Sequence, residues 1–202
     1  MTANSDTDRA EGRRKNWLAS LMFGLLYPAI LGTLFYSLLP EVLKVVRAPM
    51  ELGALQGVKL LIAFLLVAHF LVDFYLTQQV ALETSKYTPR LFLLDLGIVL
   101  ALFVAYETVH LAERTEQPEV RWVAGAMFVS YILFRAWELS LRRVIGKSCG
   151  LTVYESAIAI LFLLLAIWPN VYALAGVLVL SAVLMYRIGE PVVEQFHQRQ
   201  EQ

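Results

Sequence analysis

The stretch LLIAFLLVAHFLVDFYL, residues 60–76, decides the class of this protein, because it is long and apolar. Only two of its side chains, His69 and Asp73, titrate below pH 9. The hydrocarbon core of a bilayer is about 30 Å thick, and an α-helix of about 20 residues crosses it. With the residues that precede it from Leu55, the stretch reaches that length. It therefore predicts a membrane-spanning helix that carries an imidazole and a carboxylate.

Further runs of the same kind occur along the chain and give six predicted spans in all. In lipid, backbone polar groups must bond within a helix or a closed barrel, and the alternating pattern of barrel strands is absent. The sequence thus predicts an all-α integral membrane protein, a bundle of six transmembrane helices. The predicted spans are Trp17–Leu39, Leu55–Leu76, Leu91–His110, Trp122–Leu141, Leu151–Trp168 and Val171–Tyr186.

Composition supports this class. Of the 202 residues, 58% are hydrophobic and 17% are charged, with a mean hydropathy of +0.62, whereas soluble domains are roughly half apolar and about a quarter charged. The net charge is zero, so no basic surface for nucleic acid is expected. The single cysteine, Cys149, excludes an internal disulfide and a multi-cysteine metal site.

The distribution of lysine and arginine predicts the orientation. If the amino terminus is cytoplasmic, the inner segments carry eleven basic residues and the outer loops carry four, as the positive-inside rule expects. The prediction is a multi-pass protein of a cell membrane, and the loop charges fit a bacterial cytoplasmic membrane. Residues 1–14 are expected to form a disordered cytoplasmic tail, 15–190 the six-helix domain and 191–202 a cytoplasmic carboxy-terminal tail.

Local features of the first span predict irregular geometry. Pro28, with Gly24 and Gly32 one turn to either side, predicts a kink or a close helix contact. The following segment PEVLKVVRAP, residues 40–49, is predicted as a loop that can form a short helix at the membrane surface. Between the fifth and sixth spans, the residues WPN predict a tight helical hairpin.

Ionisable side chains inside spans are the candidate functional residues, because each costs about 2.5–3.5 kcal/mol at the bilayer centre and therefore usually faces protein or water. The alternating direction of the spans sorts them into two layers. The predicted outer layer is Lys59, Glu107 and His110. The predicted inner layer, an ion-binding site or charge network, is His69, Asp73, Asp95, Arg135, Glu138 and Glu155.

Helical-wheel positions predict how these residues meet. On the second, third and fourth spans the polar residues gather on one face, so the three faces are expected to face one another. We expect Arg135 to neutralise Asp73 or Asp95, Glu138 to pair with Arg142, and His69 to hydrogen-bond with Asp73 one turn away. Two aspartates sharing one guanidinium would leave a protonated acid or an open cation site. The alternative is that the network only sets helix register.

The sequence gives no positive sign of a cofactor, a metal site or catalysis. The motif ETVH, which pairs Glu107 with His110, occurs once, whereas di-iron bundles need it twice with further glutamates. His69 and His110 lie at different depths and so cannot together bind a haem. Because no nucleophile motif, phosphate loop or zinc motif appears, no catalytic residue, metal or cofactor is predicted, and an enzyme is not favoured.

Three function hypotheses follow. The first is a small proton- or cation-conducting channel or transporter that uses the inner layer. The second is a membrane sensor or anchor that recruits a cytoplasmic protein partner through the loop RRVIGKSCG, residues 142–150, or the carboxy-terminal tail. The third is an intramembrane enzyme. The expected partners are the lipid bilayer and further copies of the chain, which could meet through the fifth and sixth spans because these lack charges between Ser156 and Tyr186.

Overall fold

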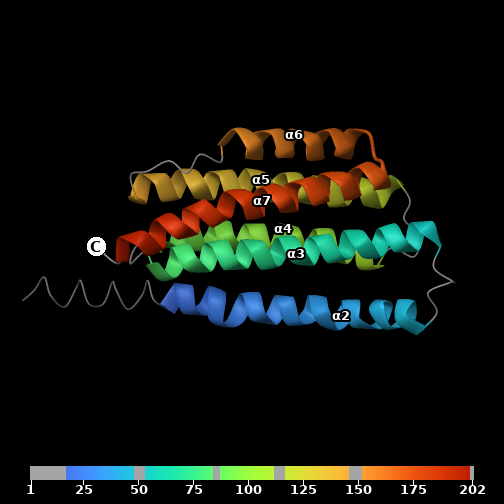
Figure 1. The fold of residues 1–202 in the computed structure, drawn as a ribbon, viewed down its shortest axis with the longest axis horizontal. Helices are drawn as coiled ribbons and strands as arrows, with labels where there is room; N and C mark the ends of the chain where they lie inside the picture. Colours follow the sequence, from blue (N-terminus) through green and yellow to red (C-terminus); the bar gives the residue numbers. More distant parts are fainter. Residues whose placement is uncertain (1–16, 48–52, 84–86, 112–116, 146–151, 201–202) are drawn as a thin grey trace, which may run out of the picture.

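The structure is a computed structural model that describes residues 17–47, 53–83, 87–111, 117–145 and 152–200 (Figure 1). Six long helices, and no strands, make up these residues. The first contains a π-helical turn, η1 (Met22–Leu26), and continues as α2. The helices are α2 (Tyr27–Arg47), α3 (Ala54–Glu83), α4 (Pro89–Leu111), α5 (Gln117–Ile145), α6 (Thr152–Ile167) and α7 (Val171–Gln200).

The helices form an elongated bundle in which consecutive elements run in opposite directions (Figure 1). The main helix pairs are α4 with α5, α5 with α6 and α3 with α7, while α2 lies against α3 and α4. The first helix begins and α7 ends at the same end of the bundle (Figure 1). The prediction of an all-helical protein with six helices is therefore confirmed.

Three of the helices are long and apolar enough to cross a membrane: Trp17–Arg47, Gln56–Gln78 and Pro89–Val109. The apolar parts of α6 and α7 are shorter, Tyr154–Ile167 and Val171–Arg187. At 1.5 Å per residue, α6 is about 24 Å long. The predicted fifth span thus forms a helix that is shorter than a bilayer core.

A π-helical turn lies directly before Pro28, where the sequence predicts a kink or a close helix contact. The backbone N–H of Tyr27 bonds to the carbonyl of Met22, five residues back. Proline lacks an N–H, and its ring collides with the carbonyl four residues earlier, so the wider turn relieves that crowding just before Pro28. Such turns are often found at functional sites. Here the turn points Met22, Phe23 and Tyr27 into the bundle, where all three are buried.

Two other segments differ from the sequence expectation. The segment after Leu39 does not form a separate helix, because α2 continues through Pro40 to Arg47. The missing N–H of Pro40 leaves the carbonyl of Tyr36 without its helical partner, and both residues lie on an exposed face. At the other end of the chain, α7 continues through Pro191 to Gln200, so most of the predicted tail is helical.

Helix ends follow local sequence signals. Thr88 caps α4, since its hydroxyl accepts a bond of 3.3 Å from the N–H of Leu91, and Pro89 occupies the first helical position. Asn170 caps α7 through bonds of 3.0 Å from the N–H groups of Tyr172 and Ala173. The short WPN connection between α6 and α7 therefore ends in a well-formed helix cap.

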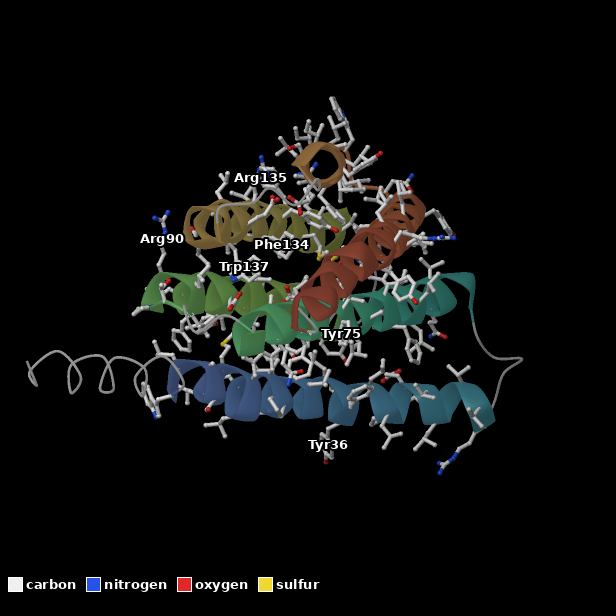
Figure 2. The ribbon with its side chains drawn as sticks, turned by 60° about the vertical axis from the view of Figure 1, so that its left-hand side comes forward. Tyr36, Tyr75, Arg90, Phe134, Arg135 and Trp137 are labelled. Carbon is white, nitrogen blue, oxygen red and sulfur yellow. The ribbon has the colours of Figure 1, made fainter. Side chains whose placement is uncertain are left out.

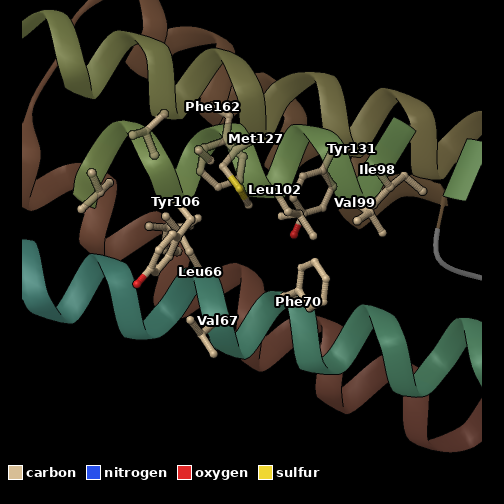
Figure 3. Close-up of a cluster of buried hydrophobic side chains, with 14 of the residues drawn as sticks. Leu66, Val67, Phe70, Ile98, Val99, Leu102, Tyr106, Met127, Tyr131 and Phe162 are labelled. Atoms are coloured by element: carbon tan, nitrogen blue, oxygen red, sulfur yellow. The ribbon is translucent and has the colours of Figure 1, made fainter. Parts of the chain in front are cut away.

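The bundle is apolar on its outside as well as in its core. Aliphatic and aromatic side chains fill the space between α3, α4 and α5, as Figure 3 shows for Leu66, Leu102 and Met127. Large apolar residues are also exposed on every helix. Tyr36, for example, is 83% exposed and points away from the bundle (Figure 2). Large contiguous apolar patches on a protein surface mark sites of contact with other proteins or with a membrane.

Candidate functional site

The first part of the candidate site is a carboxylate held by a tyrosine. Asp73 of α3 is 1% exposed, and its Oδ2 accepts a hydrogen bond of 2.5 Å from the hydroxyl of Tyr27 on α2. Thr77, one turn further along α3, lies 3.5 Å from the same hydroxyl and donates to the backbone carbonyl of Asp73. The other carboxylate oxygen, Asp73 Oδ1, has no hydrogen-bond partner among the described residues.

A second carboxylate repeats this arrangement. Asp95 of α4 is fully buried, and its Oδ2 accepts a hydrogen bond from the hydroxyl of Tyr87. The Thr88 cap places Tyr87 just before α4, two turns from Asp95. Burial, together with the neighbouring Asp95 carboxylate, raises the pKa of Tyr87, so this phenol stays protonated and acts as the donor. Asp95 Oδ1, like Asp73 Oδ1, lacks a partner within the described ranges.

Aromatic rings connect the two tyrosine–aspartate pairs. The ring of Phe23 stacks on Tyr27 at 5.5 Å and meets Tyr87 edge-on at 5.9 Å. Phe70 and Phe74 of α3 also contact Tyr27, each with a ring-centroid distance of 5.1 Å. Phe23 therefore contacts both tyrosines that bond the aspartates. The site thus holds two carboxylates inside an apolar and aromatic shell, without a lysine or arginine within 4.0 Å of either among the described residues.

A cavity of about 20 Å³ adjoins Asp73. Residues of four helices line it, and its polar members are His69, Asp73, Ser130 and Tyr131. Figure 3 shows Tyr131 projecting from α5 toward Phe70 of α3. The volume is enough for about one water molecule. The apolar members are Ile98, Leu102, Met127, Phe134 and Met185.

His69 connects α3 to α7 rather than to Asp73. Its Nδ1 lies 2.7 Å from the carbonyl of Leu65, and its Nε2 lies 2.6 Å from the hydroxyl oxygen of Ser181. The expected hydrogen bond to Asp73 is therefore wrong. Both ring nitrogens are taken by closer partners, although His69 and Asp73 border the same cavity.

The predicted role of Arg135 is also wrong. Its Nη1 lies 2.6 Å from Glu138 Oε2, one turn along α5, and 3.9 Å from Glu155 Oε2 on α6. Figure 2 shows Arg135 on the side of α5 that faces α6. The guanidinium therefore pairs with two buried glutamates at the α5–α6 contact, whereas tyrosine hydroxyls donate hydrogen bonds to the aspartates. The predicted inner layer divides into two separate groups, and the side chain of Arg142, the expected partner of Glu138, lies outside the described residues.

The outer layer has a more ordinary setting. Lys59 and Glu107 are both partly exposed, and the side chain of His110 lies outside the described residues. The buried polar group nearest in sequence is Tyr106, whose hydroxyl donates to the carbonyl of Leu34 at 3.0 Å and lies 2.8 Å from the hydroxyl of Ser37. In the described part of the chain, no group of three or more potential metal ligands occurs.

Sequence reasoning missed Tyr27, Tyr87 and Ser181. Tyr27 lies within the first predicted span and Tyr87 precedes the third, and the candidates were chosen among residues that carry a charge or titrate near neutral pH, so these neutral hydroxyls were not considered. A usable signal was present beside Tyr27, because Pro28 marks a place where the helix must depart from regular geometry. Ser181 carried no signal, since its contact with His69 depends on how α7 packs against α3.

The comparisons with known proteins found no matching family model, no similar curated protein and no similar solved structure. The geometry of the site is therefore the basis for inferring a function.

Proposed function

We propose that the chain is an integral membrane protein whose six helices cross a bilayer, with both termini in the cytoplasm. Three helices of sufficient length and the apolar outer surface of the bundle support the insertion. The first helix begins and α7 ends at the same end of the bundle (Figure 1), which is consistent with an even number of crossings. The excess of basic residues in the segments at that end supports the orientation.

We further propose that the protein is a small channel or transporter for protons or cations. The observation that carries this proposal is Asp73: a buried carboxylate, with one oxygen free of partners among the described residues, bordering a cavity between four helices. An ionised carboxylate in an apolar interior is unstable unless it is paired. Asp73 therefore favours a bound proton or cation, and repeated binding and release would transport that ion.

Ion flux in proteoliposomes tests this proposal. Vesicles containing the protein should dissipate a proton, sodium or potassium gradient faster than empty vesicles. Asp73→Asn keeps the shape of the side chain and an acceptor for Tyr27 but removes the titratable group, so we expect flux to be lost. Glu107→Gln is the matched control, since it neutralises a partly exposed carboxylate away from the cavity. Undiminished flux in Asp73→Asn would contradict the proposal.

A second candidate, a membrane anchor or sensor for a cytoplasmic partner, has one observation in its favour. Helix α7 spans 30 residues, about 45 Å, while its apolar part ends at Arg187. The remaining turns contain Glu190, Glu194 and Arg199 and would extend beyond the membrane. Truncation after residue 188 tests this candidate. It should remove any partner recovered by crosslinking and leave ion flux unchanged.

A further inference from the structure

Two buried polar groups beside the cavity lack hydrogen-bond partners among the described residues. These are Asp73 Oδ1 and the hydroxyl of Tyr131, which is 7% exposed. Both residues line the cavity of about 20 Å³. Buried polar atoms are nearly always satisfied by protein or by water, and a buried water needs two to four polar partners and about this volume. One water molecule at this position would satisfy both groups.

The oxygen atoms around the cavity are too few for a divalent cation. Ca²⁺ takes about six to eight oxygen ligands and Mg²⁺ about six. Besides the carboxylate of Asp73, the lining offers the hydroxyls of Ser130 and Tyr131, and the Ser130 hydroxyl already donates to the carbonyl of Met127 at 2.7 Å. The remaining polar member is the imidazole of His69. A proton needs only one acceptor, so the cavity suits a proton better than a divalent cation.

His69 and Ser181 can exist in two hydrogen-bonding states. The carbonyl of Leu65 only accepts, so His69 Nδ1 carries a proton in both. In the neutral imidazole, the Ser181 hydroxyl donates to Nε2, 2.6 Å away. In the imidazolium, Nε2–H donates to Ser181, whose own proton then bonds the carbonyl of Leu178 at 2.9 Å. The hydroxyl proton of Ser181 therefore has an acceptor in each state, either Nε2 of neutral His69 or the carbonyl of Leu178.

The hydroxyl of Tyr131 closes the gap between Ser181 and the cavity. It lies beside Ser181, without a hydrogen bond of regular geometry to it, and borders the same cavity as Asp73. The path from Ser181 to Tyr131 requires the Ser181 hydroxyl to rotate away from the carbonyl of Leu178 toward Tyr131. The order along this path is therefore His69, Ser181, Tyr131, the cavity and Asp73.

We propose that these groups form a proton relay, in which one water in the cavity connects Tyr131 to Asp73, and that the transported ion is the proton; this inference rests on the proposed function. In one transfer, the Nε2–H bond of the His69 imidazolium breaks and a proton passes to Ser181. Ser181 releases its own proton to Tyr131, Tyr131 to the water and the water to Asp73 Oδ1. The net change is one proton moved from His69 to Asp73. Every hydroxyl and the water end with the number of protons they began with.

Other titratable groups also face Asp73 and would modulate the transfer. They come from the helices that pack around it. The described part of α7 presents no titratable side chain to the cavity. The groups are Tyr27 on α2, His69 on α3, Tyr87 and Asp95 at α4, and Tyr131 on α5.

Selective flux measurements test the relay. In proteoliposomes containing a pH-sensitive dye, proton flux should fall at least about tenfold in Ser181→Ala and in Tyr131→Phe. The matched controls are Ser140→Ala and Tyr106→Phe. Within the described ranges, the hydroxyl of the buried Ser140 bonds only a carbonyl of its own helix. The double variant should lose no more flux than either single variant, because both interrupt one chain.

The identity of the transported ion distinguishes a failure of the relay from a failure of the proposed function. Sodium or potassium flux without proton flux would overturn the relay and leave the proposed function intact. Absence of flux for all three ions in the wild-type protein would overturn the proposed function. Proton flux that survives both Ser181→Ala and Tyr131→Phe would contradict the relay alone.

Infrared difference spectroscopy tests the water contact without a flux assay. The C=O band of the protonated Asp73 side chain is assigned by its disappearance in Asp73→Asn. Loss of Tyr131 should release the bridging water, so the band should shift to higher frequency in Tyr131→Phe and stay in place in Tyr106→Phe. An unchanged band in Tyr131→Phe would refute the water contact, even if the purified protein transports protons.

Discussion

The hydrogen bond from Tyr27 to Asp73 should stabilise the fold more than an ordinary contact between helices. Tyr27→Phe removes the hydroxyl but keeps the ring that stacks on Phe23 and contacts Phe70. After the change, neither oxygen of Asp73 has a partner among the described residues, since Oδ1 has none already. The substitution therefore isolates the effect of a single hydrogen bond on a buried carboxyl group.

The magnitude follows from the depth and chemistry of the bond. Hydrogen bonds between membrane helices contribute about 0.6 kcal/mol on average and up to about 1.7 kcal/mol, and bonds to charged groups contribute about 1.5–3 kcal/mol. The Tyr27–Asp73 bond is 2.5 Å long and buried. We expect Tyr27→Phe to lower the free energy of unfolding by about 2 kcal/mol.

Tyr106→Phe provides the matched comparison. Its hydroxyl is also buried, but it bonds a neutral carbonyl of Leu34 and the hydroxyl of Ser37, so we expect a loss of about 0.6 kcal/mol. The difference of about 1.4 kcal/mol corresponds to a tenfold change in the folding equilibrium. Reversible unfolding by SDS in mixed micelles, followed by tryptophan fluorescence, measures both. If Tyr27→Phe is no more destabilising than Tyr106→Phe, the special role of this bond is refuted.

Two further predictions concern contacts of α5. Replacing Gly97 of α4 by Leu should lower the free energy of unfolding by about 1–3 kcal/mol, because even a Cβ there would lie 3.0 Å from Leu133 Cδ1. In the control Gly125→Ala, the added Cβ meets nothing within 4 Å, so this change should be neutral or stabilising by up to about 1 kcal/mol. Equal effects of the two changes in SDS titrations would contradict the close packing at Gly97. Arg135→Gln leaves two buried glutamates without their shared cation and should lower the free energy of unfolding by about 2–3 kcal/mol. This is below the range for a fully buried pair, because the Arg135 side chain is 29% exposed. A loss of stability under about 0.5 kcal/mol, as expected for the exposed control Arg121→Gln, would show that the ion pair has no structural role.

The elements were predictable because their signal is local. Long apolar runs such as residues 60–76 form helices wherever they occur, and the caps at Thr88 and Asn170 need only a few neighbouring residues. The polar faces of α3 and α4 also followed from the helical period, which is why Asp73 and Asp95 were recognised as candidates. The lengths of the helices were less predictable. Pro40 and Pro191 are accommodated within α2 and α7, although proline usually marks a helix end.

Partners were not predictable in the same way. Arg135 was expected to neutralise an aspartate because it is the basic residue of the inner layer. The structure pairs it with Glu138 and Glu155 instead. A charged side chain at a given depth can contact any of the helices that surround its own helix. The sequence pattern of one helix does not indicate which of these neighbours it contacts. The hydroxyls of tyrosine, which carry no charge and suit many positions, were missed for the same reason.

The sequence by itself determined that the chain is helical and apolar, and that His69 and Asp73 share one face of α3, because periodicity and hydropathy are properties of a single segment. Only the tertiary structure decided that Tyr27 and Tyr87 hold the two aspartates, that Ser181 bonds His69, and that a cavity lies beside Asp73. These contacts join residues as far apart as His69 and Ser181. They exist only after α3 and α7 have packed together, since the rotation of each helix about its axis is set by side-chain packing with its neighbours.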